Sequence, residues 1–162
     1  MKPKVYIETT IPSYLAGRPS RDLVIAGNQE ITREWWTERR VEFDLCISQF
    51  VLDEAGLGDR EAVLRRMEVL AGLNELGITD EAVRLAEKLI REGVVPQKAA
   101  VDAAHIAVAA VHEVDYLLTW NCKHIANAEI MKKIYGLCKD EGFNCPVICT
   151  PAELMGGYKD EN

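Results

Sequence analysis

The sequence predicts an α/β protein with a three-layer α/β/α fold, in which a central, mostly parallel sheet lies between two layers of helices. Short β-prone runs alternate along the chain with segments of helical periodicity, and this alternation is typical of parallel α/β folds. One helical segment around residue 105 is apolar nearly all round, as expected of a helix buried beside the sheet. The chain of 162 residues is long enough for one complete hydrophobic core.

The first half of the chain is expected to form two strands and several helices. A β-prone run at 5–7 predicts the first strand, and alternating apolar and polar residues at 41–47 predict the second. Ser20 and Ser48 are expected to cap the helices that follow them. The expected helices are a short one after Ile11 and Pro12, one at 20–40 with Leu23, Ile31 and Trp35 on one face, one from Ser48 to near Gly56, and one lined by Val63, Met67, Leu70 and Ala71.

The second half continues the alternation of strands and helices. Its expected elements are a turn or edge segment around Leu76 and Ile78, a helix lined by apolar residues from Ala82 to Ile90, the apolar helix at 98–112, a strand at 116–118, a helix at 127–139 capped by Asn127, and a last strand at 146–148. We expect one domain over residues 1–155 and a flexible tail at 156–162.

The composition excludes several classes of protein. Five cysteines form no Cys-x-x-Cys pair, so reduced thiols are expected rather than disulfides or a zinc site. With no apolar stretch of membrane-spanning length and no signal peptide, we expect a cytoplasmic protein without a membrane partner. Glycine-rich phosphate loops of known type are absent from the sequence. Because the net charge is −7, a nucleic-acid substrate would need a local basic patch, metal ions or a second chain.

Polar residues stand where several predicted elements reach one edge of the sheet. Glu8 follows the first strand, Glu54 lies on the helix after the second strand, and Asp102 begins the apolar helix. Thr119 and Asn121 follow a later strand. Open α/β sheets bind ligands at the carboxyl ends of their strands, so we expect these groups to converge. Clustered oxygen ligands favour Mg²⁺ or Mn²⁺, which can activate water for phosphodiester hydrolysis.

Several of the candidate residues also have a structural interpretation. Asp102 alone could be a carboxylate that caps its helix or interacts with the helix dipole. His105, on the same stripe of the helix, is expected to be a buried packing residue rather than a base. Lys123 and His124 are candidates for contact with a phosphate, or else an exposed helix start. Trp120 is expected to anchor the loop rather than to stack on a base.

Four motifs, in this order, resemble those of the PIN-domain ribonucleases, a family that includes the VapC toxins of toxin–antitoxin pairs. The segments VYIETTIPSYL, SQFVLDE, VDAAHIAVA and LLTWNCKHIANA are similar to the family's first strand with its D-T-[NS] motif, the helix with the second acid, the D-x-x-I-A-A helix and the T-x-D segment. The resemblance covers nearly the whole chain and implies a PIN-like fold. Glu8 stands where the family usually has Asp, and Asn121 replaces the fourth Asp.

The resemblance implies a set of site residues and partners. Three carboxylates, those of Glu8, Glu54 and Asp102, would bind Mg²⁺ or Mn²⁺, with the residue at 121 completing the catalytic set. Thr10 and Thr119 would hydrogen-bond to these ligands or to a metal-bound water and orient them. An RNA substrate, an antitoxin protein and a second copy of the chain in a homodimer are the partners implied.

The leading hypothesis from the sequence is a metal-dependent endoribonuclease, in which metal-activated water attacks the RNA phosphodiester and the protein serves as the toxin of a toxin–antitoxin pair. The alternative is a catalytically weakened module with the same fold that acts through protein partners, which the two departures and the net charge of −7 favour. A third hypothesis, a receiver-like phosphoacceptor that uses Asp102 or Glu8, is weaker because no convincing partner Lys accompanies either residue.

Overall fold

Five parallel strands form the central sheet of the computed structural model, which describes residues 1–157. The strands are β1 (Lys4–Ile7), β2 (Asp44–Ser48), β3 (Asn74–Leu76), β4 (Tyr116–Leu118) and β5 (Val147–Cys149), and they lie in the order β3-β2-β1-β4-β5. All neighbouring pairs are parallel, so the carboxyl ends of the strands share one edge. The predicted parallel sheet is confirmed; most of the predicted tail at 156–162 lies outside the described residues.

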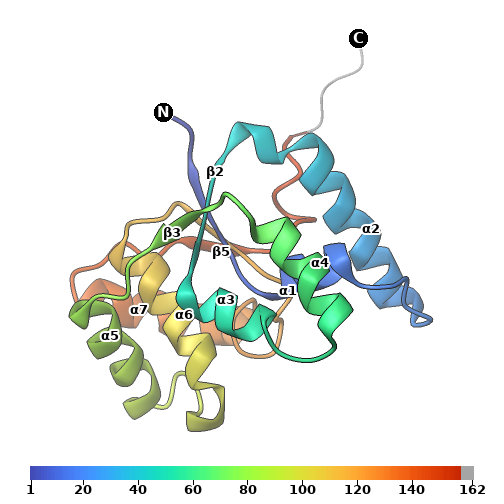
Figure 1. Ribbon diagram of the computed structural model, residues 1–162. Helices are drawn as coiled ribbons and strands as arrows, with labels where there is room; N and C mark the ends of the chain where they lie inside the picture. Colours follow the sequence, from blue (N-terminus) through green and yellow to red (C-terminus); the bar gives the residue numbers. More distant parts are fainter. Residues whose placement is uncertain (158–162) are drawn as a thin grey trace.

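Helices cover both sides of the sheet and complete the three-layer α/β/α arrangement that the sequence predicts. The α-helices are α1 (Thr10–Ala16), α2 (Leu23–Glu38), α3 (Gln49–Ala55), α4 (Arg60–Leu70), α5 (Asp80–Arg91), α6 (Ala100–Val111) and α7 (Ala128–Asp140). Figure 1 shows α5, α6 and α7 gathered on one side and α1, α2 and α4 on the other. In the described part of the chain, no helix is long and apolar enough to cross a membrane.

The order of the strands reverses between β1 and β4. The chain proceeds from β1 outward to β2 and β3 on one side, and then crosses over to β4 and β5 on the other side. The strands β1 and β4 are followed by Glu8 and Thr119, and the amide of Glu8 donates to the carbonyl of Leu118 at 3.1 Å. Because open α/β sheets bind ligands where the strand order reverses, these two residues stand at the expected position of a site.

The central position predicted for the apolar helix is confirmed by α6. Every side chain from Ala103 to Ala110 is buried, and α6 packs closely against α5. Most of these side chains are alanine or valine, so neighbouring elements approach the helix closely on all sides. The first turn of α6, with Asp102, is only half-buried and therefore reaches the surface at the edge of the sheet.

The start of the second strand differs from the prediction. Residues Arg40–Glu42 form a 3₁₀ turn, Val41 is 65% exposed, and β2 begins only at Asp44. Asp44 is the partner of Lys4, the first residue of β1. The alternating pattern before Asp44 has no neighbouring strand to pair with, so it does not become part of the sheet.

The start of α2 also differs from the prediction. Asp22, and not Ser20, caps the helix, because its Oδ1 accepts hydrogen bonds from the amides of Val24 at 2.9 Å and Ile25 at 3.1 Å. Ser20 instead accepts a hydrogen bond from the amide of Asp22. Leu23 is consequently the first residue of the helix and is 88% exposed, whereas Trp35, which was predicted to share its face, is fully buried.

The burial of β4 predicts a large difference between two substitutions in the sheet. Leu117 is fully buried, so Leu117→Ala is expected to lower the free energy of unfolding by about 2–5 kcal/mol through lost contacts and a cavity. Val147 on the edge strand β5 is 54% exposed, and Val147→Ala is expected to cost less than about 1 kcal/mol. Urea denaturation measures both values, and equal losses would contradict the interior position of β4.

Candidate functional site

The carboxylate of Glu8 is buried at the end of β1, where three donors surround it. Glu8 is only 3% exposed to solvent. The amide of Thr10 lies 3.1 and 3.0 Å from the two oxygens, and the hydroxyl of Thr10 donates to Oε2 at 2.6 Å. The hydroxyl of Thr119 donates to Oε2 of Glu8 at 2.8 Å. The Thr10 hydroxyl also accepts a hydrogen bond from the amide of Trp120 at 2.8 Å. Glu8 therefore connects β1, the start of α1 and the end of β4.

Two opposing effects act on the ionisation of Glu8. Burial raises the pKa of Glu8, whereas the nearby imidazole of His105 and the hydrogen bonds from Thr10 and Thr119 lower it, and burial has the larger effect. The donors therefore stabilise the ionised carboxylate at a position where the loss of hydration disfavours it. Each hydroxyl matters most when Glu8 carries its charge.

Glu54 faces this region from α3, and its two oxygens have different surroundings. Oε1 accepts a hydrogen bond from the hydroxyl of Thr9 at 2.6 Å and lies 2.6 Å from Nε2 of His105. Within residues 1–157, no hydrogen bond reaches Oε2. Burial would raise the pKa of Glu54, but the hydrogen bond and charge interaction with His105, together with the hydrogen bond from Thr9, outweigh it and lower the pKa. Asp53, the preceding residue, bonds instead to the exposed side chain of Gln49.

Asp102 lies in the first turn of α6 beside Asn121. The oxygen of the Asn121 amide accepts from the backbone of His124 at 3.1 Å. Burial raises the pKa of Asp102, while the side-chain amide of Asn121 and the imidazoles of His105 and His124 lower it. The carboxylate of Glu54 adds to the rise, so it lies close enough to influence Asp102.

His105 belongs to the site, although the sequence indicated only a packing residue. It is fully buried, as expected, but its Nδ1 lies 2.7 Å from the hydroxyl of Tyr6 and its Nε2 contacts Glu54. The same ring influences the ionisation of Glu8, Glu54 and Asp102. The sequence does contain one indication of this position: His105 is three residues after Asp102, and residues three apart on a helix face the same way.

Two hydroxyl groups in the site were not identified from the sequence. Thr9 precedes α1 and donates to Glu54. Ser48 does not cap α3, contrary to the prediction; its hydroxyl lies 2.6 Å from that of Tyr6. The buried tyrosine needs a polar partner inside the sheet, and this requirement takes the serine away from the helix end.

The remaining predicted residues lie in the loop after β4. Lys123 is exposed and His124 half-buried, and both lie in the turn that precedes α7. Trp120 is anchored, as expected: its Nε1 donates to the hydroxyl of Thr32 at 2.7 Å, and its ring stacks on Tyr14 with centroids 6.0 Å apart. The loop that carries Lys123 and His124 is therefore fixed at Trp120.

The oxygen chemistry of the site fits a hard divalent cation. Glu54 Oε2 and the carboxylate of Asp102 are ligands of the kind that Mg²⁺ and Mn²⁺ prefer. The two oxygens of Glu8 already accept hydrogen bonds, although Oε1 accepts only from the amide of Thr10. Among residues 1–157, no three His, Cys, Asp or Glu side chains are arranged as a preformed cluster of ligands.

Comparison with known proteins rests on structure, because no family model and no curated protein matches this chain. VapBC2 from Rickettsia felis, solved bound to a DNA fragment from its promoter, matches at a TM-score of 0.55 and 15% identity, covering 91% of this chain and 98% of that chain. VapC20 from Mycobacterium tuberculosis, a Sarcin-Ricin loop cleaving toxin, matches at a TM-score of 0.54 and 15% identity. The match covers 86% of this chain and 96% of that chain. This chain has the PIN-like fold of VapC toxins. At 15% identity the similarity shows the fold, so any activity must be argued from residues.

The hydrogen bond from Thr119 to Glu8 predicts a pH-dependent loss of stability. Thr119→Val removes a donor to a buried carboxylate and is expected to cost about 1–3 kcal/mol at pH 7. Because the folded pKa of Glu8 is raised, ionisation opposes folding as the pH rises through that pKa, and the variant raises the pKa further. The cost is therefore expected to shrink as the pH falls below the folded pKa and Glu8 becomes protonated.

Urea denaturation at several pH values, with EDTA present, measures this effect. Thr119→Ser keeps the hydroxyl and is the matched control, with a smaller cost expected at every pH. The explanation would be contradicted by a cost for Thr119→Val that does not change with pH, or by equal costs in the two variants.

Proposed function

We propose that this protein is a metal-dependent endoribonuclease of the PIN-domain type, which hydrolyses RNA phosphodiester bonds as the toxin of a toxin–antitoxin pair. The observation that carries the proposal is that Glu54 and Glu8 accept hydrogen bonds from the adjacent residues Thr9 and Thr10 near the reversal point of the sheet, and that Glu54 influences the ionisation of Asp102. The similarity in fold to VapC20, a Sarcin-Ricin loop cleaving toxin, supports an RNA substrate.

The three carboxylates have distinct parts in this proposal. Glu54 and Asp102 would hold a Mg²⁺ or Mn²⁺ ion, and Glu8 would contribute Oε1, its less occupied oxygen. Close carboxylates repel each other, and a divalent cation relieves that repulsion. When bound, the ion would supply a Lewis acid that activates water and stabilises the leaving oxygen. The side-chain amide of Asn121, which lowers the pKa of Asp102, would help to orient that carboxylate.

We assign contact with RNA phosphates to Lys123 and His124. Both residues follow Asn121 directly in the turn before α7. His124 is close enough to Asp102 to lower the pKa of that carboxyl group. A phosphate beside Asp102 would therefore lie within reach of the His124 imidazole, and the ammonium group of the adjacent Lys123 favours binding of the RNA backbone.

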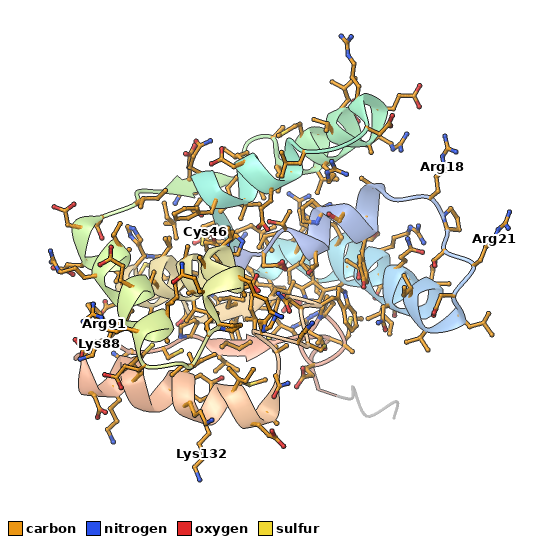
Figure 2. The ribbon with its side chains drawn as sticks, turned by 90° about the horizontal axis from the view of Figure 1, so that it is seen from below. Arg18, Arg21, Cys46, Lys88, Arg91 and Lys132 are labelled. Atoms are coloured by element: carbon orange, nitrogen blue, oxygen red, sulfur yellow. The ribbon has the colours of Figure 1, made fainter. Side chains whose placement is uncertain are left out.

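The cations that Figure 2 labels lie at the periphery of the molecule. Figure 2 shows Arg18 and Arg21 extending from the loop between α1 and α2, whereas Lys88 and Arg91 lie on α5 and Lys132 on α7, away from that loop. Lys88 is paired with Glu141 and so is partly neutralised. This distribution, with a net charge of −7, supports local contacts aided by a cation rather than a broad basic surface.

The proposed protein partners are an antitoxin and a second copy of this chain, acting in the cytoplasm. The similarity in fold to VapBC2 supports an antitoxin partner. Leu23 and Val24 at the start of α2 are 88% and 72% exposed, and such neighbouring apolar side chains favour contact with another protein.

A second candidate function is a binding module with little catalytic activity. The observation that favours it is the state of Glu8, whose carboxylate is buried and accepts hydrogen bonds from three donors. The neutral Asn121 also supplies no charge to the site. Such a protein would act through its partners, and metal binding and RNA cleavage distinguish the two functions.

The proposed nuclease predicts opposite outcomes for two neighbouring carboxylates on α3. Glu54→Gln is expected to lower the rate of RNA cleavage by about 100-fold or more and to weaken Mn²⁺ binding, because a metal ligand is lost. Asp53→Asn is the matched control, since Asp53 bonds to Gln49 at the surface, and it is expected to keep both properties. Cleavage of RNA with Mg²⁺ or Mn²⁺ and calorimetric titration with Mn²⁺ provide the measurements.

Asp102→Asn provides an independent variant from a different helix and is expected to behave like Glu54→Gln. Full activity in Asp102→Asn, or no cleavage by the wild-type protein with either metal, would refute the nuclease proposal. Failure of cleavage together with tight binding of a protein partner would favour the binding module.

The proposed homodimer predicts a solution mass of twice the 18.1 kDa of the chain. Size-exclusion chromatography with light scattering measures this mass. Leu23→Glu is expected to shift the protein toward the monomer, because it places a charge in the exposed apolar surface of α2. A monomeric wild-type protein at high concentration would contradict the homodimer.

A further inference from the structure

A continuous chain of hydrogen bonds runs from inside the sheet to Glu54. The hydroxyl oxygens of Ser48 and Tyr6 are 2.6 Å apart, and that of Tyr6 lies 2.7 Å from Nδ1 of His105. Nε2 of the same imidazole lies 2.6 Å from Glu54 Oε1. The first three residues are fully buried and come from β2, β1 and α6. Three separate elements of the fold thus support one carboxylate on α3.

The direction of each hydrogen bond follows from the hydrogens available. Burial raises the pKa of Tyr6, so its hydroxyl keeps its hydrogen. With a neutral imidazole, Ser48 donates to Tyr6, Tyr6 donates to Nδ1, and Nε2 carries the hydrogen that Glu54 accepts. With a protonated imidazole, both ring nitrogens donate and Tyr6 donates to Ser48. In both forms an N–H group faces Glu54, whereas the other neutral tautomer would place a nitrogen lone pair against the carboxylate.

These contacts leave the two oxygens of Glu54 unequal. His105 and Thr9 both bond to Oε1, each at 2.6 Å, and no hydrogen bond within residues 1–157 reaches Oε2. The side chain of Glu54 is 35% exposed, so Oε2 can be reached from solvent. Two donors on one oxygen fix the rotation of the carboxylate before any ligand arrives, which lowers the entropic cost of binding.

We propose that Tyr6 and His105 are positioning residues, which hold the Glu54 carboxylate in one orientation and present its Oε2 to a divalent cation. This inference rests on the proposed metal-dependent function. Because both residues are fully buried, they act through Glu54 and not on RNA. In metal sites, the carboxylates that bind the ion are commonly oriented by hydrogen bonds from neighbouring side chains. Ser48 contributes less, since Tyr6 can donate to His105 without it.

A pair of Tyr→Phe variants tests the proposal. Tyr6→Phe keeps the ring in the core but removes the donor to Nδ1, so the imidazole hydrogen can move to Nδ1 and Glu54 loses a bond. Calorimetric titration is expected to show Mn²⁺ binding weakened by about 10–100-fold. Tyr135→Phe makes the same chemical change on α7, where the hydroxyl accepts from the amide of Ile148 at 3.0 Å, and is expected to leave the affinity unchanged.

A second readout does not depend on metal or activity. Nitrogen-15 NMR of the metal-free protein is expected to show a hydrogen on Nε2 of His105 in the wild type and a mixture of tautomers in Tyr6→Phe. His105→Gln can supply an amide donor near the position of Nε2, so it is expected to retain more Mn²⁺ affinity than His105→Leu. Urea denaturation of each variant checks that the protein remains folded.

The outcomes separate this inference from the proposed function. If the wild type binds Mn²⁺ and Tyr6→Phe matches it in affinity and tautomer, the positioning role is overturned and the nuclease proposal stands. Equal weakening in Tyr6→Phe and Tyr135→Phe would also overturn it, because the effect would then belong to any lost hydroxyl. If the wild type neither binds Mn²⁺ nor cleaves RNA, the proposed function fails, and the presentation of Glu54 to a cation fails with it.

Discussion

The burial of the Glu8 carboxylate determines how the functional end of this protein is built. A buried carboxylate without hydrogen bonds would cost several kcal/mol, roughly, so its donors must be supplied by the fold. Thr10 supplies them from the start of α1 and Thr119 from the end of β4. Thr10 also bonds to the amide of Trp120, so the same requirement fixes the loop that carries Asn121. Stability and the geometry of the site are therefore linked through one side chain.

A second buried network begins on the same strand. Tyr6 and Glu8 are two residues apart, and residues at this spacing in a strand point to the same face. Tyr6 reaches His105 and, through it, Glu54, whereas Glu8 is surrounded by threonines. The central strand β1 thus connects both carboxylates to the interior of the sheet. The position of β1 between β2 and β4 makes this possible, because partners approach it from both sides.

Predictions from the sequence are correct for features that depend on local patterns. They are wrong where a contact with a residue distant in the sequence determines the structure. The parallel sheet and the buried α6 follow from apolar periodicity, and the three acids stand out in the sequence because each lies near the end of an element. The start of β2 was misplaced because pairing with Lys4 decides where the strand begins. Ser48 is a good N-cap by local rules, but the hydroxyl of Tyr6, 42 residues away in sequence, takes its hydrogen bond. The role of His105 depends on where α3 packs, which no local pattern indicates.

The adjacent hydroxyls of Thr9 and Thr10 bond to different acids: Thr9 to Glu54 and Thr10 to Glu8. Two consecutive residues at the start of α1 therefore set the separation of the two carboxylates. Neither acid can shift far without breaking its bond to this dipeptide, and a tilt of α1 would displace both hydroxyls together. Any contact that tilted α1 would in this way change the spacing of both acids without touching either one.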